Sequence, residues 1–292
     1  MPFDLLITDK TPRTLLSQAD LFDKCPAAFN KAPAPTVTNK YDFVDTMGAV
    51  EILQDNGFKP VYAQQKPSRK SQNIPFASHL IAFAQDLEEN PHRPEILLWN
   101  SSDGSQSLRL LSGIFRFACD NGIVCGEGLQ AKFRHIGGKT AGFENLVQEQ
   151  AKNMPKAMAK VEAMQEIQLS TIEQKDLARQ ALGLRWKSTI DVAKSFSNNW
   201  LETADYLETA SGSFFDGATI SQALRAKRVE DTPQDLWTVY NRLQESIIQG
   251  GVSLVSCTKK GIKSRQAKAV QSLKETVRLN QGLWDLAEKV AA

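Results

Sequence analysis

Apolar and polar residues alternate along short stretches between residues 58 and 135, a pattern typical of β-strands. Turn residues separate these stretches, and Asp103-Gly104 and Asn121-Gly122 are hairpin dipeptides. Strands that follow one another through short turns form an antiparallel meander. The expected strands cover 58–63, 79–84, 95–99, 107–118, 123–125 and 131–135.

The pattern changes to a helical period after residue 142. Apolar residues recur every three or four positions between Phe143 and Leu182, a stretch that holds one proline, Pro155, and no glycine. We expect a helix that Pro155 kinks or divides. A helical pattern of apolar residues continues from 186 to 207. A glycine-rich break follows at 211–217.

The remaining segments are defined by cap and breaker residues. Residues 1–40 carry several prolines and predict an irregular arm, either packed on a partner or flexible. Asp45 or Thr46 caps a helix that ends at Asn56-Gly57. Thr232 precedes Pro233 and predicts the start of a helix that Gly250-Gly251 ends. A basic loop at 259–268 and a closing helix at 270–291 complete the chain.

Together these patterns predict an α+β protein, in which an antiparallel β meander with packed helices precedes long helices and a C-terminal helical region. Four segments are expected: an arm at 1–40, the meander domain at 41–140, a long helical segment at 141–210, and the helical region with its basic loop at 211–292.

Composition supports a folded protein without a membrane span. The 292 residues are 41% hydrophobic and 23% charged, with 17 Gly and 12 Pro, which excludes disordered and collagen-like classes. No apolar run reaches the ~18 residues that span a bilayer, and the first residues lack the layout of a signal peptide. We therefore expect a cytoplasmic protein with no membrane partner.

The four cysteines and three histidines give little sign of a cofactor. Cys119 and Cys125 are the only closely spaced cysteines, no CxxC pair exists, and no two histidines lie three or four residues apart. Free thiols in a reducing compartment are expected, and neither a metal nor another cofactor is predicted.

The total charge of the chain is nearly balanced, but the charges are unevenly distributed along the sequence. The chain has 35 Lys and Arg against 33 Asp and Glu, which argues against a strongly basic nucleic-acid binder. Residues 252–279, however, hold seven Lys and Arg and one acid, Glu275. The balance therefore leaves room for a phosphate-binding surface confined to particular segments.

Three kinds of function are weighed against this pattern. An enzyme would need convergent groups, and a Cys119/His135 pair beside Asp103 is the best that the meander offers. A turn role for Asp103 and a buried role for Cys119 fit these residues better. No nucleotide-binding or hydrolase motif is present, so we expect no enzymatic activity.

Nucleic-acid binding has a larger set of candidates. The two arginines of the 107–118 strand are seven residues apart and share a face only if a bulge near Gly113 intervenes. The predicted contacts are Arg69, Lys70, Arg109, Arg116, Lys132, Arg134, Lys259, Lys260, Lys263 and Arg265. Solvated loops remain an equal interpretation of the 259–268 cluster.

Protein binding is the third possibility. Methionine side chains adapt to different partners, and the 143–182 helix carries several at helical spacing. An oligomer or partner interface is predicted at Met154, Met158, Val161 and Met164, although such a stripe is more often core.

Three blocks of the sequence resemble a family of uncharacterised phage- and plasmid-borne proteins with a domain of unknown function, including prophage relatives in enteric bacteria. The first block is YDFVDT at 41–46 with GFKPV at 57–61, Gln64, Phe76 and His79. The second is NSSDGS at 100–105 with residues 108–109, 113, 116, 119, 121–122 and 134–135. The third is LWTVYN at 236–241 with residues 244–245, 250–251, 278–280 and 283–287.

The resemblance implies an origin in phages or mobile elements, but no reaction. The expected combination of an antiparallel meander and long helices is also similar, at the level of fold alone, to phage single-strand annealing proteins. We expect a phage or mobile-element accessory protein that binds nucleic acid, single-stranded in form, as an oligomer in the host cytoplasm. The alternative is a phage-encoded inhibitor of a bacterial anti-phage defence complex, acting by protein–protein contact.

Overall fold

The computed structural model divides the chain into two compact units, Met1–Lys160 and Val161–Ala292. The helix α3 (Ala141–Glu166) contains the boundary between them. This division is coarser than the four segments expected from the sequence, whose boundaries stay predictions. The structure describes residues 14–38, 41, 43–68, 70–85, 87, 92–105, 107–116, 121–124, 130–132, 141–186, 212–258 and 261–292.

The N-terminal unit is built on an antiparallel sheet in which the first five strands pair in the order of the chain, so the predicted meander is confirmed. The short β6 pairs with β4 on the same edge as β5. The strands are β1 (Lys59–Gln65), β2 (His79–Ala84), β3 (His92–Asn100), β4 (Arg109–Arg116), β5 (Asn121–Val124) and β6 (Gln130–Lys132).

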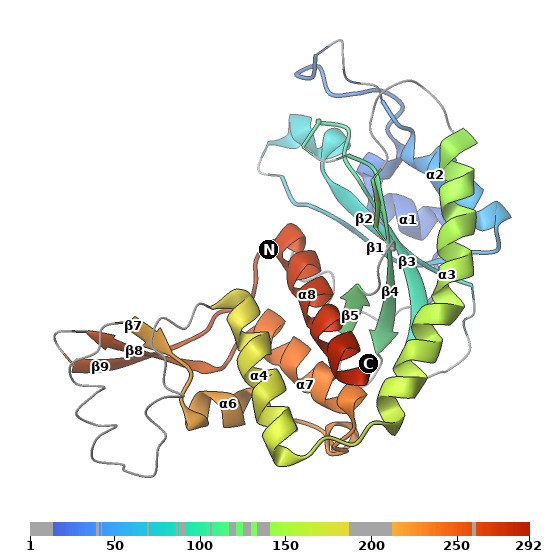
Figure 1. Ribbon diagram of the computed structural model, residues 1–292. Helices are drawn as coiled ribbons and strands as arrows, with labels where there is room; N and C mark the ends of the chain where they lie inside the picture. Colours follow the sequence, from blue (N-terminus) through green and yellow to red (C-terminus); the bar gives the residue numbers. More distant parts are fainter. Residues whose placement is uncertain are drawn as a thin grey trace, which may run out of the picture. The chain divides into compact units, whose positions relative to one another are not determined.

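Helices cover one face of this sheet. Figure 1 shows α1 (Gln18–Lys24), α2 (Thr46–Asp55) and α3 along the same side of it. Alternate strand residues such as Ile81 and Leu98 point to this side and form the core with apolar residues of the three helices. Burial of this apolar layer is the main stabilising term for the unit.

Local signals explain where the helices of this unit begin and end. Asp45 accepts a hydrogen bond from the Met47 amide at the start of α2, as predicted. Gly57, with φ of 84°, follows the end of that helix. The N-terminal arm was expected to be irregular, but it contains two short helices. Ser17 and Asp20 form a capping box that starts α1, and the 3-10 helix η2 (Pro26–Phe29) follows.

The long helix expected from 143 to 182 is two helices. Ser170 and Glu173 form a capping box that begins α4 (Thr171–Arg185), and the intervening residues pair with the start of a later helix through Leu236 N–H and Ile167 O. Pro155 lies inside α3 and does not end it. Ile172, counted in the predicted apolar stripe, is 74% exposed.

The C-terminal unit surrounds one buried helix, α7 (Leu236–Gln249). Every residue of α7 from Leu236 to Ile248 is buried, and Trp237 and Tyr240 stack with ring centroids 5.3 Å apart. Trp284 meets both rings edge-on. The remaining elements are α6 (Gly217–Ala223), η6 (Val229–Asp231), α8 (Leu273–Ala291), β7 (Gly212–Phe214), β8 (Ser253–Thr258) and β9 (Gly261–Gln266).

Two expectations for this unit were wrong. Asp235, not Thr232, caps α7 by accepting from the Thr238 amide. The predicted basic loop at 259–268 is for most of its length part of an antiparallel hairpin, in which β8 pairs with β9 from Ser253–Gln266 to Thr258–Gly261. β9 was missed because its residues are almost all polar, as is common in edge strands.

Among the residues that the structure describes, no helix combines the length and the apolar character needed to cross a membrane.

Candidate nucleic-acid interface

The predicted nucleic-acid contacts fall in both units. Lys70 and Arg109 belong to the N-terminal unit, and Lys263 and Arg265 to the C-terminal unit. Arg116 and Lys132 are described by their strand positions alone. The rest, Arg69, Arg134, Lys259 and Lys260, lie outside the described residues, as do Cys119 and His135.

The register of β4 separates its two arginines. β4 pairs with β3 without interruption from Arg109–Trp99 to Arg116–His92, so there is no bulge near Gly113. Positions seven apart in a regular strand belong to opposite faces and lie about 23 Å apart along it. The bulge that would bring both arginines to one face is therefore absent, whereas position 132 lies directly opposite Arg109 in the register.

Arg109 is held against an aromatic ring. Its guanidinium carbon lies 5.3 Å from the centroid of the Trp99 ring. The residue is half-buried, and its buried Nε has no hydrogen-bond partner among the described residues. The Trp99 indole N–H in turn donates to Ser78 Oγ at 2.8 Å. A cation–π contact of this kind fixes the side chain without neutralising its charge.

A buried polar cluster occupies the same end of this sheet. His79 Nδ1 donates to Ala77 O, so its Nε2 accepts from Thr46 Oγ1, at 2.9 Å in each case. Thr46 Oγ1 accepts in turn from Asn100 Nδ2 at 3.0 Å. Burial lowers the pKa of His79 to about 4, so the ring is neutral near pH 7. The cluster links α2 to two strands and offers solvent no acid or base.

The polar loop after β3 is likewise organised as structure. Asp103 accepts from the Ser105 amide at 2.9 Å, and Gly104 between them has φ of 77°, so Asp103 forms a turn as the sequence suggested. Tyr41 donates its hydroxyl proton to Ser101 O at 2.8 Å. Burial, and to a lesser degree the charge of Asp103, raises the pKa of Tyr41 to about 12. The Tyr41 hydroxyl is therefore protonated near pH 7.

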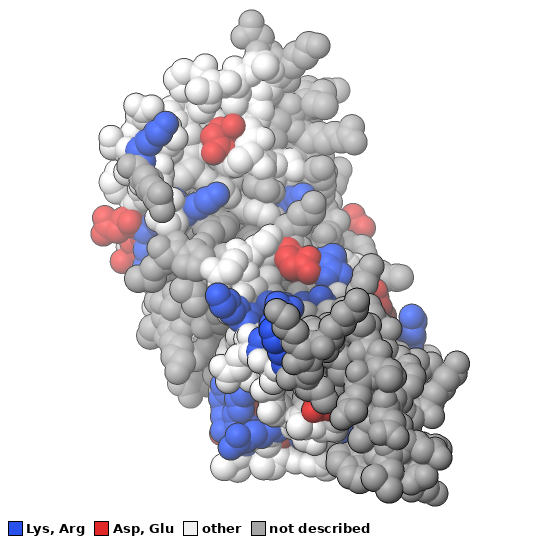
Figure 2. All heavy atoms as spheres, turned by 90° about the vertical axis from the view of Figure 1, so that its left-hand side faces the viewer, with Lys and Arg blue, Asp and Glu red and all other residues white. Residues whose placement is uncertain are grey.

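Exposed cations gather on the C-terminal unit. Lys263 and Arg265 are two residues apart on β9 and therefore share one face of that strand, and Lys268 follows it. All three are exposed and have no acidic partner among the described residues. Figure 2 views the molecule from the side on which β9 lies and shows Lys and Arg side chains grouped in its lower half, with few acids among them. We call these three residues the basic surface.

A second basic run was missed at the sequence level. Residues 225–228 read RAKR, and counting charge in short windows would have found them. Lys227 Nζ lies 3.1 Å from Glu245, and Arg228 pairs with both Glu245 and Asp231. Arg225 is exposed and has no acidic partner in the part of the chain that the structure describes.

The four residues predicted to form an oligomer or partner interface pack mostly inside the chain. Met154 is 6% exposed and belongs to the core of the N-terminal unit, and Val161 and Met164 are each 1% exposed. Met158 is half-buried. These side chains therefore act as packing residues and do not form an exposed apolar stripe.

No group of three or more His, Cys, Asp or Glu within the described residues is arranged to hold a metal ion.

Comparison with known proteins places this chain among proteins of unknown activity. It is 30% identical over 275 residues to "UPF0380 protein YafZ" of Escherichia coli (strain K12), covering 94% of this chain and 90% of that protein. It is 29% identical over 275 residues to "UPF0380 protein YfjQ" of the same strain, with the same coverage. No solved structure matches the chain. The family model described as "Domain of unknown function (DUF932)" matches residues 34–284, and the chain belongs to this family.

Proposed function

We propose that this protein binds nucleic acid, single-stranded in form, through the basic surface of its C-terminal unit, and that it does so without catalysis. The observation that carries the proposal is the exposure of Lys263, Arg265 and Lys268 with no acidic partner among the described residues. A cation that is already paired with an acid of the protein gains little binding free energy from a phosphate. An unpaired cation neutralises the phosphate and releases the counterions bound to the nucleic acid.

The spacing of the two strand residues matches that of neighbouring phosphates along one strand. Lys263 and Arg265 are separated by about 6.6 Å along β9, since a strand rises about 3.3 Å per residue. That separation is close to the distance between neighbouring phosphates of an extended single strand. β9 is also an edge strand of the described sheet, so a strand of nucleic acid has access to it along its length.

The wider proposal rests on the sequence. The resemblance to phage- and plasmid-borne proteins supports an accessory role for a mobile element in the cytoplasm of a bacterial host. The oligomer and the contacts predicted in the N-terminal unit, Lys70, Arg109, Arg116 and Lys132 among them, stay predictions.

Fluorescence anisotropy with a labelled single-stranded oligonucleotide tests the proposal. We expect the double variant Lys263→Ala/Arg265→Ala to lose at least about tenfold in affinity at low salt. The matched control is Lys152→Ala/Lys156→Ala, which removes the same charge from exposed positions of α3 and should bind as the parent chain does.

Equal losses in the two double variants would show a general charge effect and contradict the proposed surface. A chain that binds neither single strands nor duplex of the same sequence would overturn nucleic-acid binding altogether. The inhibitor of a host defence complex would then become the leading hypothesis.

A further inference from the structure

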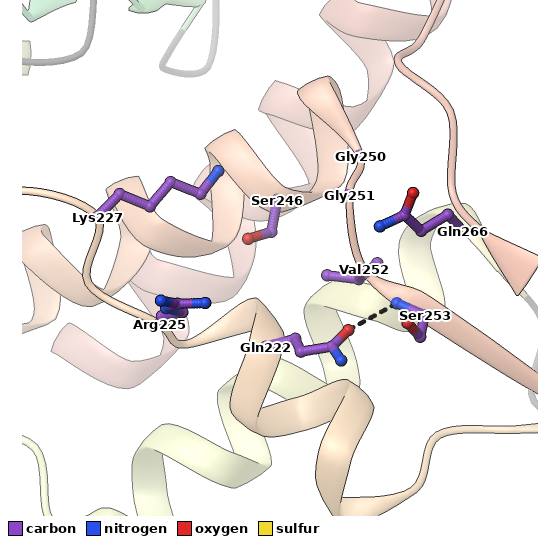
Figure 3. A pocket seen from close by; sticks show the side chains of 9 residues that line it. All are labelled: Gln222, Arg225, Lys227, Ser246, Gly250, Gly251, Val252, Ser253 and Gln266. Atoms are coloured by element: carbon purple, nitrogen blue, oxygen red, sulfur yellow. Dashed lines mark hydrogen bonds between the residues drawn. The ribbon is translucent and has the colours of Figure 1, made fainter.

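A pocket lined mostly by residues with polar side chains opens in the C-terminal unit at the end of the strand that carries the basic surface. It has a volume of ≈ 270 Å³ and is lined by residues of α6, α7, β8 and β9 and of the segments between them. Figure 3 shows Arg225 and Lys227 on one side of it and Ser253 and Gln266 on the other, with Ser246 and Gly250-Gly251 between. Gln266 is the last residue of β9, so the pocket lies at one end of the strand that carries Lys263 and Arg265.

The cationic side of the pocket retains positive charge. Arg225 has no acidic partner among the described residues, and Lys227 shares the Glu245 carboxylate with Arg228. Arg228 also pairs with Asp231, so these three cations face two acids. Lys227 remains 42% exposed and has two ammonium protons beyond the one that it gives Glu245. The pocket therefore favours an anion.

The opposite side of the pocket offers amides with defined orientation. Gln222 Oε1 accepts from the Ser253 amide at 2.7 Å, which fixes the carboxamide and leaves its Nε2 as a donor. Gln266 is exposed and has no side-chain hydrogen bond in the described part of the chain. Side-chain amides bind the polar edges of bases and the hydroxyl groups of sugars.

Two glycines line the pocket between its two sides. Gly250 and Gly251 have φ of 78° and 87°, and nothing lies within 4 Å of a Cβ placed at Gly251. Their amides are already used, since Gly250 N–H donates to Ser246 O and Gly251 N–H to Ala267 O. An anion in the pocket is therefore bound by side chains, not by a backbone cradle.

The volume and the charge of the pocket limit which ligands it can bind. A volume of ≈ 270 Å³ is at the small end of ligand sites, which run from about 300 to 1,000 Å³, and leaves room for about one nucleotide. A terminal phosphomonoester carries nearly two negative charges at neutral pH, whereas a phosphodiester within a strand carries one. A terminal phosphate also has three free oxygens, and Arg225 together with the remaining ammonium protons of Lys227 supplies donors for them on one wall.

We propose that this pocket binds the terminal phosphate of a nucleic-acid strand that lies on the basic surface, with Arg225 and Lys227 on the phosphate and Gln222 and Gln266 on the terminal nucleotide. The inference rests on the proposed function and deepens it: the protein recognises strand ends. Arg225 supplies the contact that a terminal phosphate gains and an internal one does not.

The test uses the full chain and oligonucleotides of one sequence that end in a 5′-phosphate, a 3′-phosphate or hydroxyl groups at both ends. We expect one of the phosphorylated forms to bind about tenfold more tightly than the hydroxyl form, as for one added charge-assisted contact. Arg225→Gln should reduce that ratio to near one. Lys268→Gln, outside the pocket, should weaken both forms alike and keep the ratio.

Each other outcome overturns the inference in a distinguishable way. Equal binding of all three oligonucleotides contradicts recognition of strand ends but leaves the proposed function intact. Binding of none contradicts the proposed function itself. If deoxycytidine monophosphate alone binds the parent chain and not Arg225→Gln, while the oligonucleotides show no end preference, the pocket serves free nucleotides and the proposal for strand ends fails.

Discussion

Gly250 is a residue at which the neighbouring backbone leaves no room for a side chain. A Cβ at this position would lie 2.8 Å from the Lys268 carbonyl carbon and closer still to Ala267 O, both of which are backbone atoms that cannot rotate away. Its φ of 78° is in addition costly for any other residue. The approach lets Gly251 N–H reach Ala267 O at 2.9 Å and joins α7 to the end of β9.

We therefore expect Gly250→Ala to reduce the free energy of unfolding by roughly 2–4 kcal/mol, since steric overlap adds to backbone strain. Gly251→Ala is the matched control: its φ is 87° but its Cβ meets nothing within 4 Å, so only about 1 kcal/mol is expected. Urea unfolding followed by circular dichroism measures both. Equal losses of unfolding free energy in the two variants would show that steric overlap with Ala267 does not contribute to the effect at Gly250.

His79 gives the N-terminal unit a pH dependence. Its pKa is about 4 in the folded chain against 6.5 for the free side chain, because burial disfavours the charged ring. The unfolded chain therefore binds more protons between these values, so stability is full above pH 6.5 and falls as the pH drops toward 4. The loss is on the order of 3 kcal/mol over that range.

The variant His79→Gln tests this dependence. A glutamine amide retains a donor for Ala77 O and an acceptor for Thr46 but does not titrate, so the fall in stability between pH 7 and pH 4.5 should shrink. Urea midpoints at the two pH values report the difference. An unchanged fall in the variant would assign the pH dependence to other groups.

At the scale of elements, Arg185 ties three segments of the C-terminal unit together. It ends α4, and its guanidinium donates to Ile247 O at the end of α7 and to Lys268 O after β9. The side chain also lies over the Trp186 ring, with the guanidinium carbon 4.6 Å from the centroid. One planar cation thus satisfies two carbonyls that no other described side chain reaches.

Arg185→Ala should therefore cost about 2–3 kcal/mol of unfolding free energy, the range for hydrogen bonds from a charged donor to carbonyls left otherwise unpaired. Arg185→Lys should recover only part, because an ammonium lacks the planar fork. Arg179→Ala, on the exposed side of the same helix beside Asp176, should change stability by less than about 0.5 kcal/mol. Thermal or urea unfolding ranks the stabilities of the three variants. An equal loss of stability in Arg179→Ala and Arg185→Ala would contradict the proposed role of Arg185 in joining the three segments.

Elements were predictable where one local signal sufficed. Alternation located the meander, and the Asp45 cap placed the start of α2. The Ser170–Glu173 capping box was equally readable, but apolar residues on both sides of it suggested one continuous helix. Thr232 and Asp235 are both capping types, and the bond of Leu236 N–H to Ile167 O, far away in sequence, accompanies the choice of Asp235.

The candidate site was less predictable, because sequence shows where cations are but not which of them are neutralised. Lys227 and Arg228 meet Glu245, 18 and 17 residues later, only through the packing of α7, whereas Arg225 in the same run does not. The pocket could not be foreseen for the same reason: its walls come from segments that tertiary structure alone brings together.

At the scale of the whole molecule, a net charge of +2 hides an uneven distribution. The two units each hold cations predicted to contact nucleic acid. In the N-terminal unit Lys70 is exposed but Arg109 is half-buried against Trp99, whereas Lys263, Arg265 and Lys268 of the C-terminal unit are all exposed. Binding through released counterions depends on the exposed set. The salt dependence of the full chain should therefore come mostly from the C-terminal unit.

The slope of log affinity against log salt concentration measures this directly. For a single strand each phosphate contact contributes about 0.7 to the slope, so Lys263→Ala/Arg265→Ala should flatten it by about 1.4. Lys70→Ala/Arg109→Ala removes the same charge from the N-terminal unit and should flatten the slope by less, since only Lys70 of this pair is exposed. Anisotropy titrations between about 50 and 200 mM salt resolve the two cases. If both pairs flatten the slope alike, the strand contacts both units, and the interface is not confined to the basic surface.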